Sequence, residues 1–195
     1  MARIERAAGS HAPGKLRIIG GSLRGSKLGI PDLPGLRPTP DRVRETLFNW
    51  LMPVIGGAQC LDLFAGTGAL GIEALSRGAG AVDFVETDAR LADCLRANLL
   101  RLKQPAQVHR ADAAQFLASG NVRYDIVFLD PPFSAELWTP VAQALLAHGR
   151  LKDDAWLYVE SPAQTALGLP ADFTLHREGR AGAVRYALYR RSAKL

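Results

Sequence analysis

Hydrophobic residues recur with two different periods along most of the chain. Short runs that are apolar on both faces indicate buried strands at residues 60–64, 81–86, 106–110, 124–130 and 155–160. Helical spacing, with apolar residues three or four positions apart, separates several of these runs, at residues 69–77, 89–102 and 135–149. Strands of this kind that alternate with helices are typical of a mainly parallel sheet covered on each side. The pattern therefore predicts an α/β fold.

The beginning of the chain departs from this pattern. Residues 1–40 are dense in glycine, proline and basic residues, and their short alternating pieces predict a small β-hairpin. Thr39 and Pro40 then offer an N-cap and a proline at the first helical position. The helix that they would start covers residues 41–51, where apolar side chains share one face.

The end of the chain departs from it as well. Residues 173–178 and 183–191 alternate in the manner of strands and predict a last hairpin, placed as an antiparallel edge of the sheet. A chain of 195 residues suits one domain of ordinary size with a small appendage. We therefore expect a basic N-terminal extension over 1–40 and a single domain over 41–195.

Composition narrows the class of protein. The chain is 48% hydrophobic and carries a net charge of +5, and no apolar run approaches the ~20 residues of a membrane span. Its first ten residues lack the apolar core of a secretory signal. Cys60 opens a strand and Cys94 lies in a helix, so two buried thiols are expected rather than a disulfide. The four histidines show no ligand spacing, so no metal site is expected. A cytoplasmic protein away from membranes fits these features.

The charge is unevenly distributed. Residues 1–45 hold nine Lys/Arg against four Asp/Glu, and residues 176–195 hold six against one. The centre, 46–175, holds nine against fourteen and is mildly acidic. Basic ends are sometimes only solvated tails, but arginines clustered among glycines are also how a protein meets a phosphate backbone.

A glycine turn between a strand and a helix is the first candidate for chemistry. The segment LDLFAGTGALGIEAL, 61–75, lets the backbone pass close to a ligand and ends at a helix start with free N–H groups. The glycines are not followed by Lys-Ser/Thr, which argues against a P-loop. Glu86 ends the next strand, eighteen residues after Gly68, where a carboxylate suits the two hydroxyls of a ribose.

Two further acids end strands in the same way. Asp112, in HRADAAQF, would on its own be read as the N-cap of the following helix. Asp130, in FLDPPF, would on its own be an ordinary strand-end residue. The glycine turn, Glu86 and these two acids nevertheless end four strands in succession, and ligands of open parallel sheets bind outside the carboxyl ends of the strands. Together they favour an adenosine-type pocket.

At these residues the chain resembles a known class of enzymes. DLFAGTG, Glu86, RADA and above all DPPF resemble Rossmann-like S-adenosylmethionine-dependent methyltransferases, and the D/N-P-P-aromatic signature is shared by members that methylate planar nitrogens. RIIGGSLRG, GLRPTPDRVRETLFNWL, CLDLFAGTGALGIEALSRGA, YVES and LHRE extend the resemblance, over nearly the whole chain, to the bacterial RsmD family.

The resemblance implies a fold and an activity. The fold is the class I methyltransferase fold, a mainly parallel seven-stranded sheet with a C-terminal antiparallel hairpin, here preceded by a small N-terminal β-hairpin. The activity is methyl transfer from S-adenosylmethionine to the exocyclic N2 of a guanine in 16S rRNA. The implied partner is an assembled or partly assembled small ribosomal subunit, and we expect a monomer.

The resemblance also assigns residues, position by position. Cofactor binding falls to Asp62, Ala65, Gly66, Thr67, Gly68, Glu86, Thr87, Asp112, Ala113 and Thr39. Catalysis falls to Asp130, Pro131, Pro132 and Phe133. The basic composition of the N-terminal end, and not the resemblance, leads us to expect contacts with RNA phosphates from Arg17, Arg24, Lys27 and Arg37.

Asp130 explains why a strand would end in an acid and two rigid residues. A guanine amine is a poor nucleophile because its lone pair is delocalised into the ring. Asp130 and the carbonyl of Pro131 can accept its two hydrogens and turn the lone pair toward the methyl group, while the prolines keep both acceptors aimed. Phe133 can stack on the base once the base has left its helix or loop, or it simply closes the core.

Three other functions are compatible with parts of the sequence. A DNA amino-methyltransferase would use DPPF equally well, but it normally needs a target-recognition module, and only about 40 N-terminal residues remain outside the core. A protein glutamine methyltransferase more often has Asn at position 130 and needs no basic ends. A non-catalytic RNA-binding assembly factor would have no use for Asp130, Gly66 and Glu86.

Overall fold

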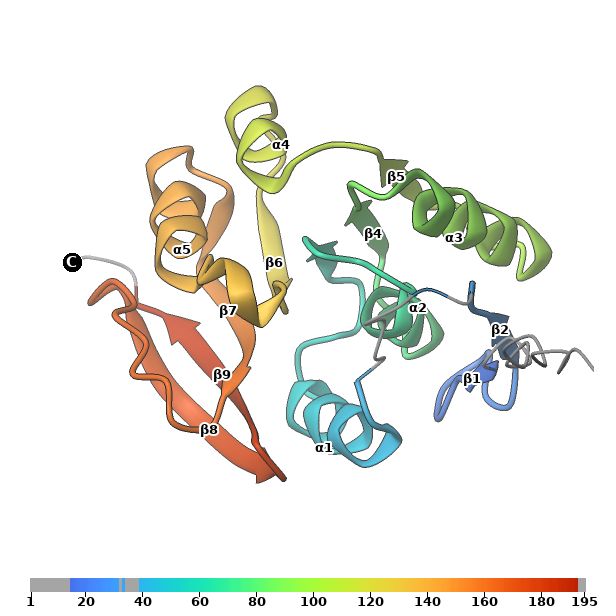
Figure 1. Ribbon diagram of the computed structural model, residues 1–195, viewed down its shortest axis with the longest axis horizontal. Coiled ribbons are helices and arrows are strands. Elements are labelled where there is room, and N and C mark those ends of the chain that lie inside the picture. The colour runs from blue at the N-terminus through green and yellow to red at the C-terminus, as the bar shows by residue number, and fades with distance from the viewer. Residues whose placement is uncertain (1–14, 32, 34–38, 193–195) are drawn as a thin grey trace, which may run out of the picture.

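Strands and helices alternate through the computed structural model, which describes residues 15–31, 33 and 39–192 (Figure 1). The strands are β1 (Lys15–Arg17), β2 (Lys27–Gly29), β3 (Gln59–Asp62), β4 (Ala81–Val85), β5 (Gln107–His109), β6 (Tyr124–Leu129), β7 (Leu151–Pro162), β8 (Phe173–Ala181) and β9 (Val184–Arg191). The helices are α1 (Asp41–Leu51), α2 (Ala69–Ser76), α3 (Ala89–Arg101), α4 (Ala113–Ser119) and α5 (Trp138–Ala147), with a 3-10 turn, η1, at Phe133–Ala135. No helix of the described chain is long and apolar enough to cross a membrane.

The main sheet has seven strands in the order β5-β4-β3-β6-β7-β9-β8. The pairs from β5 to β7 are parallel, and β9 is antiparallel to both of its neighbours. From β3 the chain builds outward through β4 and β5, then returns to place β6 on the other side of β3. The strand order therefore reverses between β3 and β6, which is where open α/β sheets bind their ligands.

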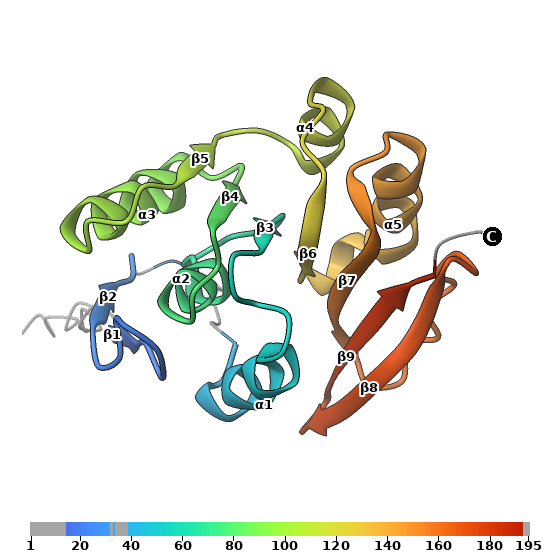
Figure 2. The same cartoon turned by 180° about the vertical axis from the view of Figure 1, so that it is seen from behind.

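Helices cover both faces of the sheet, as Figures 1 and 2 show. Along β3 and β6 successive side chains alternate between two buried clusters, because strand side chains point to opposite faces in turn. Cys60 and Phe128 belong to the cluster that contains residues of α1, α2 and α3. Leu61 and Val127 belong to the one that contains residues of α4 and α5. This two-sided burial is the physical reason for the apolar runs in the sequence.

The N-terminal hairpin of β1 and β2 shares the first of these clusters. Leu16, Ile18 and Leu28 are buried together with side chains of α1 and α2. At Gly21, where φ is +75°, an added Cβ would lie 1.8 Å from the carbonyl oxygen of Ser76, so only glycine fits against the end of α2. The hairpin is therefore packed into the fold and is not a separate appendage in space.

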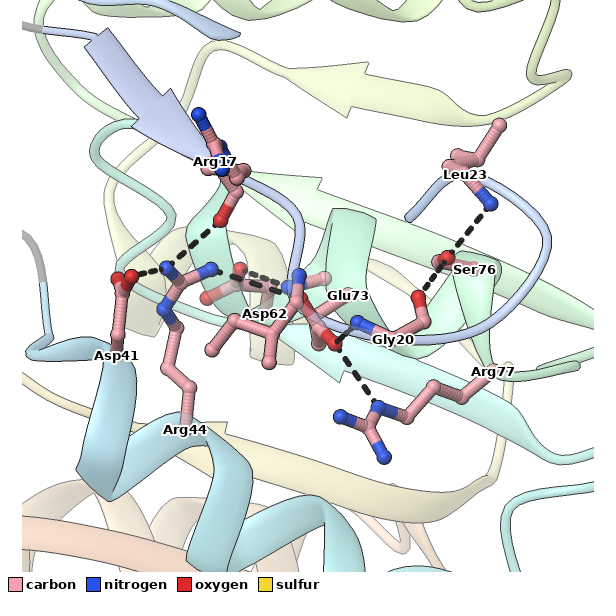
Figure 3. A network of polar contacts seen from close by, with 11 residues as sticks. Arg17, Gly20, Leu23, Asp41, Arg44, Asp62, Glu73, Ser76 and Arg77 are labelled. Atoms are coloured by element: carbon pink, nitrogen blue, oxygen red, sulfur yellow. Dashed lines mark hydrogen bonds and ion pairs between the residues drawn. The ribbon is translucent and has the colours of Figure 1, made fainter. Parts of the chain in front are cut away.

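Side chains of α1 and α2 hold the hairpin by its backbone (Figure 3). Glu73, fully buried in α2, accepts hydrogen bonds from the backbone N–H groups of Ile19 and Gly20, both at 2.9 Å. Arg44 of α1, also fully buried, donates to the carbonyl oxygen of Arg17 at 2.9 Å and lies 3.6 Å from the Glu73 carboxylate. Because these contacts use the main chain, the exposed side chains of Arg17, Arg24 and Lys27 are left free for other partners.

Most predicted elements occur within a few residues of their predicted ends, and the terminal hairpin of β8 and β9 is confirmed. Two predictions are wrong. Pro40, not Thr39, is the N-cap of α1, and no side chain caps this helix. Cys94 is only partly buried, although it and Cys60 are both free thiols. A further difference is in β7, which begins at Leu151 rather than at residue 155.

Candidate active site

A cavity of about 1030 Å³ lies at the carboxyl ends of β3, β4 and β6. Its size is at the upper end of the ~300–1,000 Å³ usual for small-molecule sites. Among the predicted site residues, it is lined by Thr39, Asp62, Ala65, Gly66, Thr67, Glu86, Thr87, Asp112, Ala113, Asp130, Pro131, Pro132 and Phe133. The strand ends that the sequence singled out are thus brought to one place by the switch in strand order.

The glycine turn between β3 and α2 forms one wall. Gly66 and Gly68 have φ values of +52° and +76°, which side-chain-bearing residues rarely adopt. Gly68 is not among the residues that line the cavity, and an added Cβ there would lie 2.4 Å from Leu95 of α3. Gly68 is the N-cap of α2, and no side chain caps it. The first backbone N–H groups of α2 are therefore available as donors, except where a neighbouring acid takes them.

Two acids brace this turn. One carboxylate oxygen of Glu86, at the end of β4, accepts from the Gly66 N–H at 2.8 Å, and the other accepts from the Asp88 N–H at 2.8 Å. Asp62 is buried and accepts from the Gly71 N–H at 2.9 Å. A carboxylate has about four lone-pair sites, so Glu86 keeps acceptor capacity for a ligand. Sequence reasoning gave Glu86 a ligand but missed this contact with the turn.

Burial raises the pKa of Asp62 to about 7, because an ionised carboxylate is poorly solvated inside the fold. The hydrogen bond from Gly71 opposes this shift, and the nearby charge of Glu86 adds to it. Close to neutral pH, a charge that enters the cavity beside Asp62 would therefore change the fraction of this carboxyl group that is ionised.

Asp112 satisfies both interpretations that the sequence left open. It is the N-cap of α4, and its Oδ1 accepts from the N–H groups of Ala114 at 2.8 Å and Gln115 at 3.4 Å. It also lines the cavity beside Ala113 and Thr87. Its Oδ2 makes no hydrogen bond within the described residues, so one oxygen remains for a ligand.

The DPPF segment forms the opposite wall. Asp130 follows the last residue of β6, and the two prolines carry the chain to the 3-10 turn. Burial is the main cause that raises the pKa of Asp130 well above its usual range, followed by the charges of Glu160 and Asp62. Phe133 is 38% exposed, and its ring centroid lies 6.0 Å from that of Trp138. An aromatic ring that lines the cavity and stays partly exposed suits stacking better than core closure.

Glu160, two residues before the end of β7, also lines the cavity. Its carboxylate accepts from the hydroxyl of Thr39 at 2.8 Å and from that of Tyr158 at 2.9 Å. Sequence reasoning did not name Glu160 as a site residue. The signal was present, because the run AWLYVE ends in an acid as three earlier strands do.

The predicted RNA-contacting residues lie apart from the cavity. Arg17, Arg24 and Lys27 are exposed on the N-terminal hairpin, and none of them forms an ion pair within the described part of the chain. Arg37 lies outside the described residues. Cations that are exposed and unpaired are available to an anionic partner.

The fold and this site together define a class of protein. A sheet of this order, a glycine turn after β3 and an acid-proline-proline-aromatic segment after β6 characterise a Rossmann-like α/β methyltransferase.

A family model described as "Conserved hypothetical protein 95" matches residues 16–190. Ribosomal RNA small subunit methyltransferase D of Escherichia coli (strain K12) is 52% identical over 183 residues, 93% of this chain and 92% of that protein. Its namesake in Haemophilus influenzae is 45% identical over 184 residues, 92% and 95% of the two chains. The solved structure of yhhF from Escherichia coli, 51% identical, aligns with a TM-score of 0.87 over 93% of this chain and 100% of that one. The chain belongs to this family, the RsmD family.

Proposed function

We propose that this protein transfers a methyl group from S-adenosylmethionine to the exocyclic N2 of a guanine in 16S rRNA. The observation that carries the proposal is the position of Asp130, which opens into the same cavity as the glycine turn. A methyl donor on the turn and a planar amine on Asp130 would then meet inside one cavity. Relatives at 52% and 45% identity named for ribosomal RNA small subunit methylation support rRNA as the substrate.

The charge of the cavity fits this cofactor. Asp62, Glu86, Asp112, Asp130 and Glu160 line it, and no Lys or Arg does so within the described residues. S-adenosylmethionine carries a sulfonium and an ammonium group, and it supplies an electrophilic methyl group when bound. An opposite charge within about 4–6 Å stabilises the ionised form of a buried acid, so a cation relieves the mutual repulsion of these carboxylates.

Each part of the cofactor has candidate partners. The backbone of Ala65, Gly66 and Thr67, with the uncapped start of α2, would hold the methionine end beside Asp62. Glu86 would accept from the ribose hydroxyls with the lone pairs that Gly66 and Asp88 leave free. A second group would hold the adenine and close the cavity: Asp112, Ala113, Thr87 and Thr39.

Asp130 and the carbonyl of Pro131 would hold the target amine by its two hydrogens. This arrangement turns the nitrogen lone pair out of conjugation with the ring and toward the methyl group, and the two prolines limit the movement of both acceptors. Phe133 would stack on the flipped base at the cavity edge. Preorganised acceptors of this kind need no rearrangement at the moment of reaction.

The N-terminal hairpin would provide the contact with RNA. Arg17, Arg24 and Lys27 are exposed on a β-hairpin whose backbone is fixed to α1, α2 and α3, so their charges are held in a defined position relative to the cavity. Arg37 is placed with them from the sequence. We propose that the substrate is an assembled or partly assembled small subunit and that the protein acts in the cytoplasm as a monomer.

Transfer of labelled methyl groups to purified small subunits, to DNA and to total protein tests the proposal directly. We expect label in 16S rRNA at guanine N2, and Asp130→Ala should slow single-turnover transfer by about 10²–10⁴-fold. Asp130→Asn keeps an acceptor oxygen and should retain more activity than Asp130→Ala if orientation dominates. Label in DNA or in a protein glutamine would replace the substrate, and an Asp130→Ala variant at the parental rate would remove Asp130 from the chemistry.

A further inference from the structure

Glu160 and Asp130 occupy matching positions on neighbouring strands. In the parallel pairing of β6 and β7, Phe128 lies opposite Tyr158 and Leu129 lies opposite Val159. The next residues in this register are Asp130 and Glu160, so both follow the ends of the ladder on the same side. Side chains two positions apart on a strand share a face, so Asp130 and Glu160 lie on the same face as the paired residues Phe128 and Tyr158. Both acids line the cavity.

The Glu160 carboxylate is fixed on one side only. Its Oε1 accepts both hydroxyl groups, from Thr39 at 2.8 Å and from Tyr158 at 2.9 Å. Its backbone oxygen accepts from the indole N–H of Trp138 at 2.6 Å. Oε2 makes no hydrogen bond within the described residues, although the residue is only 4% exposed. One carboxylate oxygen of Glu160 is thus held by two hydroxyls, and the other has no partner among the described residues, at a position that lines the cavity.

The surroundings of this pair are acidic and phenolic. The charge of Asp62, in β3, contributes to the raised pKa of Asp130. Tyr158 of β7 interacts with Glu160 and with Tyr186 of β9. No described Lys or Arg lines the cavity. Burial raises the pKa of Glu160, and the hydroxyls of Thr39 and Tyr158 oppose that shift. The Glu160 charge in turn is the second cause, after burial, of the raised pKa of Asp130.

We propose that Glu160 is a positioning residue for methyl transfer, whose charge, held by Thr39 and Tyr158, makes Asp130 a better acceptor for the proton of the target amine. This inference rests on the proposed function. In the reaction the nitrogen–methyl bond forms while the carbon–sulfur bond breaks and leaves its electron pair on sulfur. The nitrogen then keeps the electrons of one N–H bond, and the proton passes to the Asp130 carboxylate.

The chemistry gives a reason for such an arrangement. An aspartate with an ordinary pKa is ionised at neutral pH but is a weak base, and proton transfer is most effective when the acceptor pKa lies near the working pH. Burial and the Glu160 charge both favour the protonated form of Asp130, whereas a cationic ligand in the cavity favours its ionised form. Glu160 would therefore make the protonation of Asp130 dependent on the charge of the bound ligand.

The pH profile of single-turnover transfer by Glu160→Gln is the first test. The amide keeps an oxygen for Thr39 and Tyr158 but removes the charge, so the acid limb of the profile should move to lower pH. The rate on the plateau should fall by about tenfold, since Asp130 becomes a weaker base. Glu160→Asp keeps a charge and should leave the limb close to that of the parent. A profile of Glu160→Gln that superimposes on the parent's overturns the inference.

Thr39→Val is the matched control, because it removes one hydroxyl contact and keeps the carboxylate. We expect this variant to raise the KM for the RNA or the cofactor, and to move the acid limb of the pH profile less than Glu160→Gln does. A limb that moves further in Thr39→Val than in Glu160→Gln contradicts the inference, because Thr39 is proposed to act only through the Glu160 charge.

Proton release on ligand binding gives a readout that needs no activity. Calorimetric titration in two buffers of different ionisation enthalpy measures the protons released when S-adenosylmethionine or the uncharged-sulfur product S-adenosylhomocysteine binds. The parent should release more protons with the sulfonium ligand, and Glu160→Gln should reduce that difference. Equal release by both ligands in the parent contradicts the inference. If the parent does not methylate rRNA, but releases more protons with the sulfonium ligand and Glu160→Gln reduces that difference, the proposed substrate fails while the role of the carboxylate pair stands.

Discussion

Replacing Glu73 by glutamine should destabilise the fold strongly, although Glu73 lies outside the cavity. Its buried carboxylate accepts from Ile19 N, Gly20 N and Arg77 Nε, each at 2.9 Å. The Nη1 of Arg44, whose side chain is fully buried, lies 3.6 Å from the same carboxylate. Glutamine keeps one acceptor oxygen and turns an NH₂ group toward donors that then have no partner.

The magnitude follows from these contacts. Hydrogen bonds to a charged group contribute about 1.5–3 kcal/mol each, and removal of one partner from a buried ion pair costs about 3–5 kcal/mol. Arg44 keeps its contacts with Asp41 and the carbonyl oxygen of Arg17, which limits the loss. We therefore expect Glu73→Gln to lower the free energy of unfolding by about 3–5 kcal/mol.

Urea unfolding followed by tryptophan fluorescence and circular dichroism measures this loss. For a urea slope near ~3 kcal/mol per molar, the midpoint should fall by about 1–2 M. Asp93→Asn is the matched acid-to-amide control, because Asp93 forms an exposed ion pair with Arg96 and its side chain is 73% exposed. Its cost should stay below about 1 kcal/mol.

Arg44→Met separates the two buried charges. It leaves Glu73 with Arg77 and two backbone donors, so it should cost less than Glu73→Gln, and the double variant should cost less than the sum of the two. A Glu73→Gln variant that loses no more stability than Asp93→Asn would refute the argument, because the backbone contacts of the hairpin would then contribute nothing measurable.

Two further predictions concern charge. Because burial raises the pKa of Asp62 above its unfolded value, the native state binds more protons between about pH 4 and 7, and stability should fall as pH rises through that window. Asp62→Asn should make this fall less steep when unfolding of the ligand-free protein is measured against pH, and an unchanged slope would contradict the prediction. The second concerns Arg17, Arg24 and Lys27. Replacing each by glutamine should reduce the slope of log binding constant against log salt concentration for RNA by roughly 0.7–0.9, while the cofactor affinity measured by calorimetry stays unchanged. A slope that does not change would show that the hairpin is only solvated.

The sequence predicted elements well where the pattern is local. Helix α1 covers the predicted residues 41–51 because Val43, Leu47 and Leu51 recur on one face. The start of β7 was missed because Lys152, Asp153 and Asp154 are charged and do not belong to the apolar run that begins at residue 155. In the structure Lys152 pairs with Asp125, Asp153 with Arg123 and Asp154 with Arg190, so partners distant in sequence stabilise polar residues in a strand.

In the candidate site too, residues with a local sequence signal could be predicted, and contacts between residues distant in sequence could not. Strand-end acids could be named from the sequence because each follows its own apolar run, and the parallel order of the sheet brings them together. The partner of Thr39 could not be named, since Glu160 lies 121 residues away and the local signal favoured an N-cap. Glu73 was missed for a related reason: an acid within the apolar helix ALGIEALSR has no local partner, and its backbone donors lie more than 50 residues earlier.

Helix α2 connects the proposed cofactor site with the hairpin that is proposed to contact RNA. Its uncapped start follows the glycine turn of the cavity, and Glu73 and Ser76 near its end bind the backbone of the hairpin. All eight residues of the helix are buried, so neither end can shift without disturbing the shared core. Removal of the extension 1–40 would expose that core and leave Glu73 without two of its donors. Loss of cofactor binding after such a deletion would therefore not show that the extension binds cofactor. Substitution of the exposed cations alone separates RNA contact from the stability of the fold.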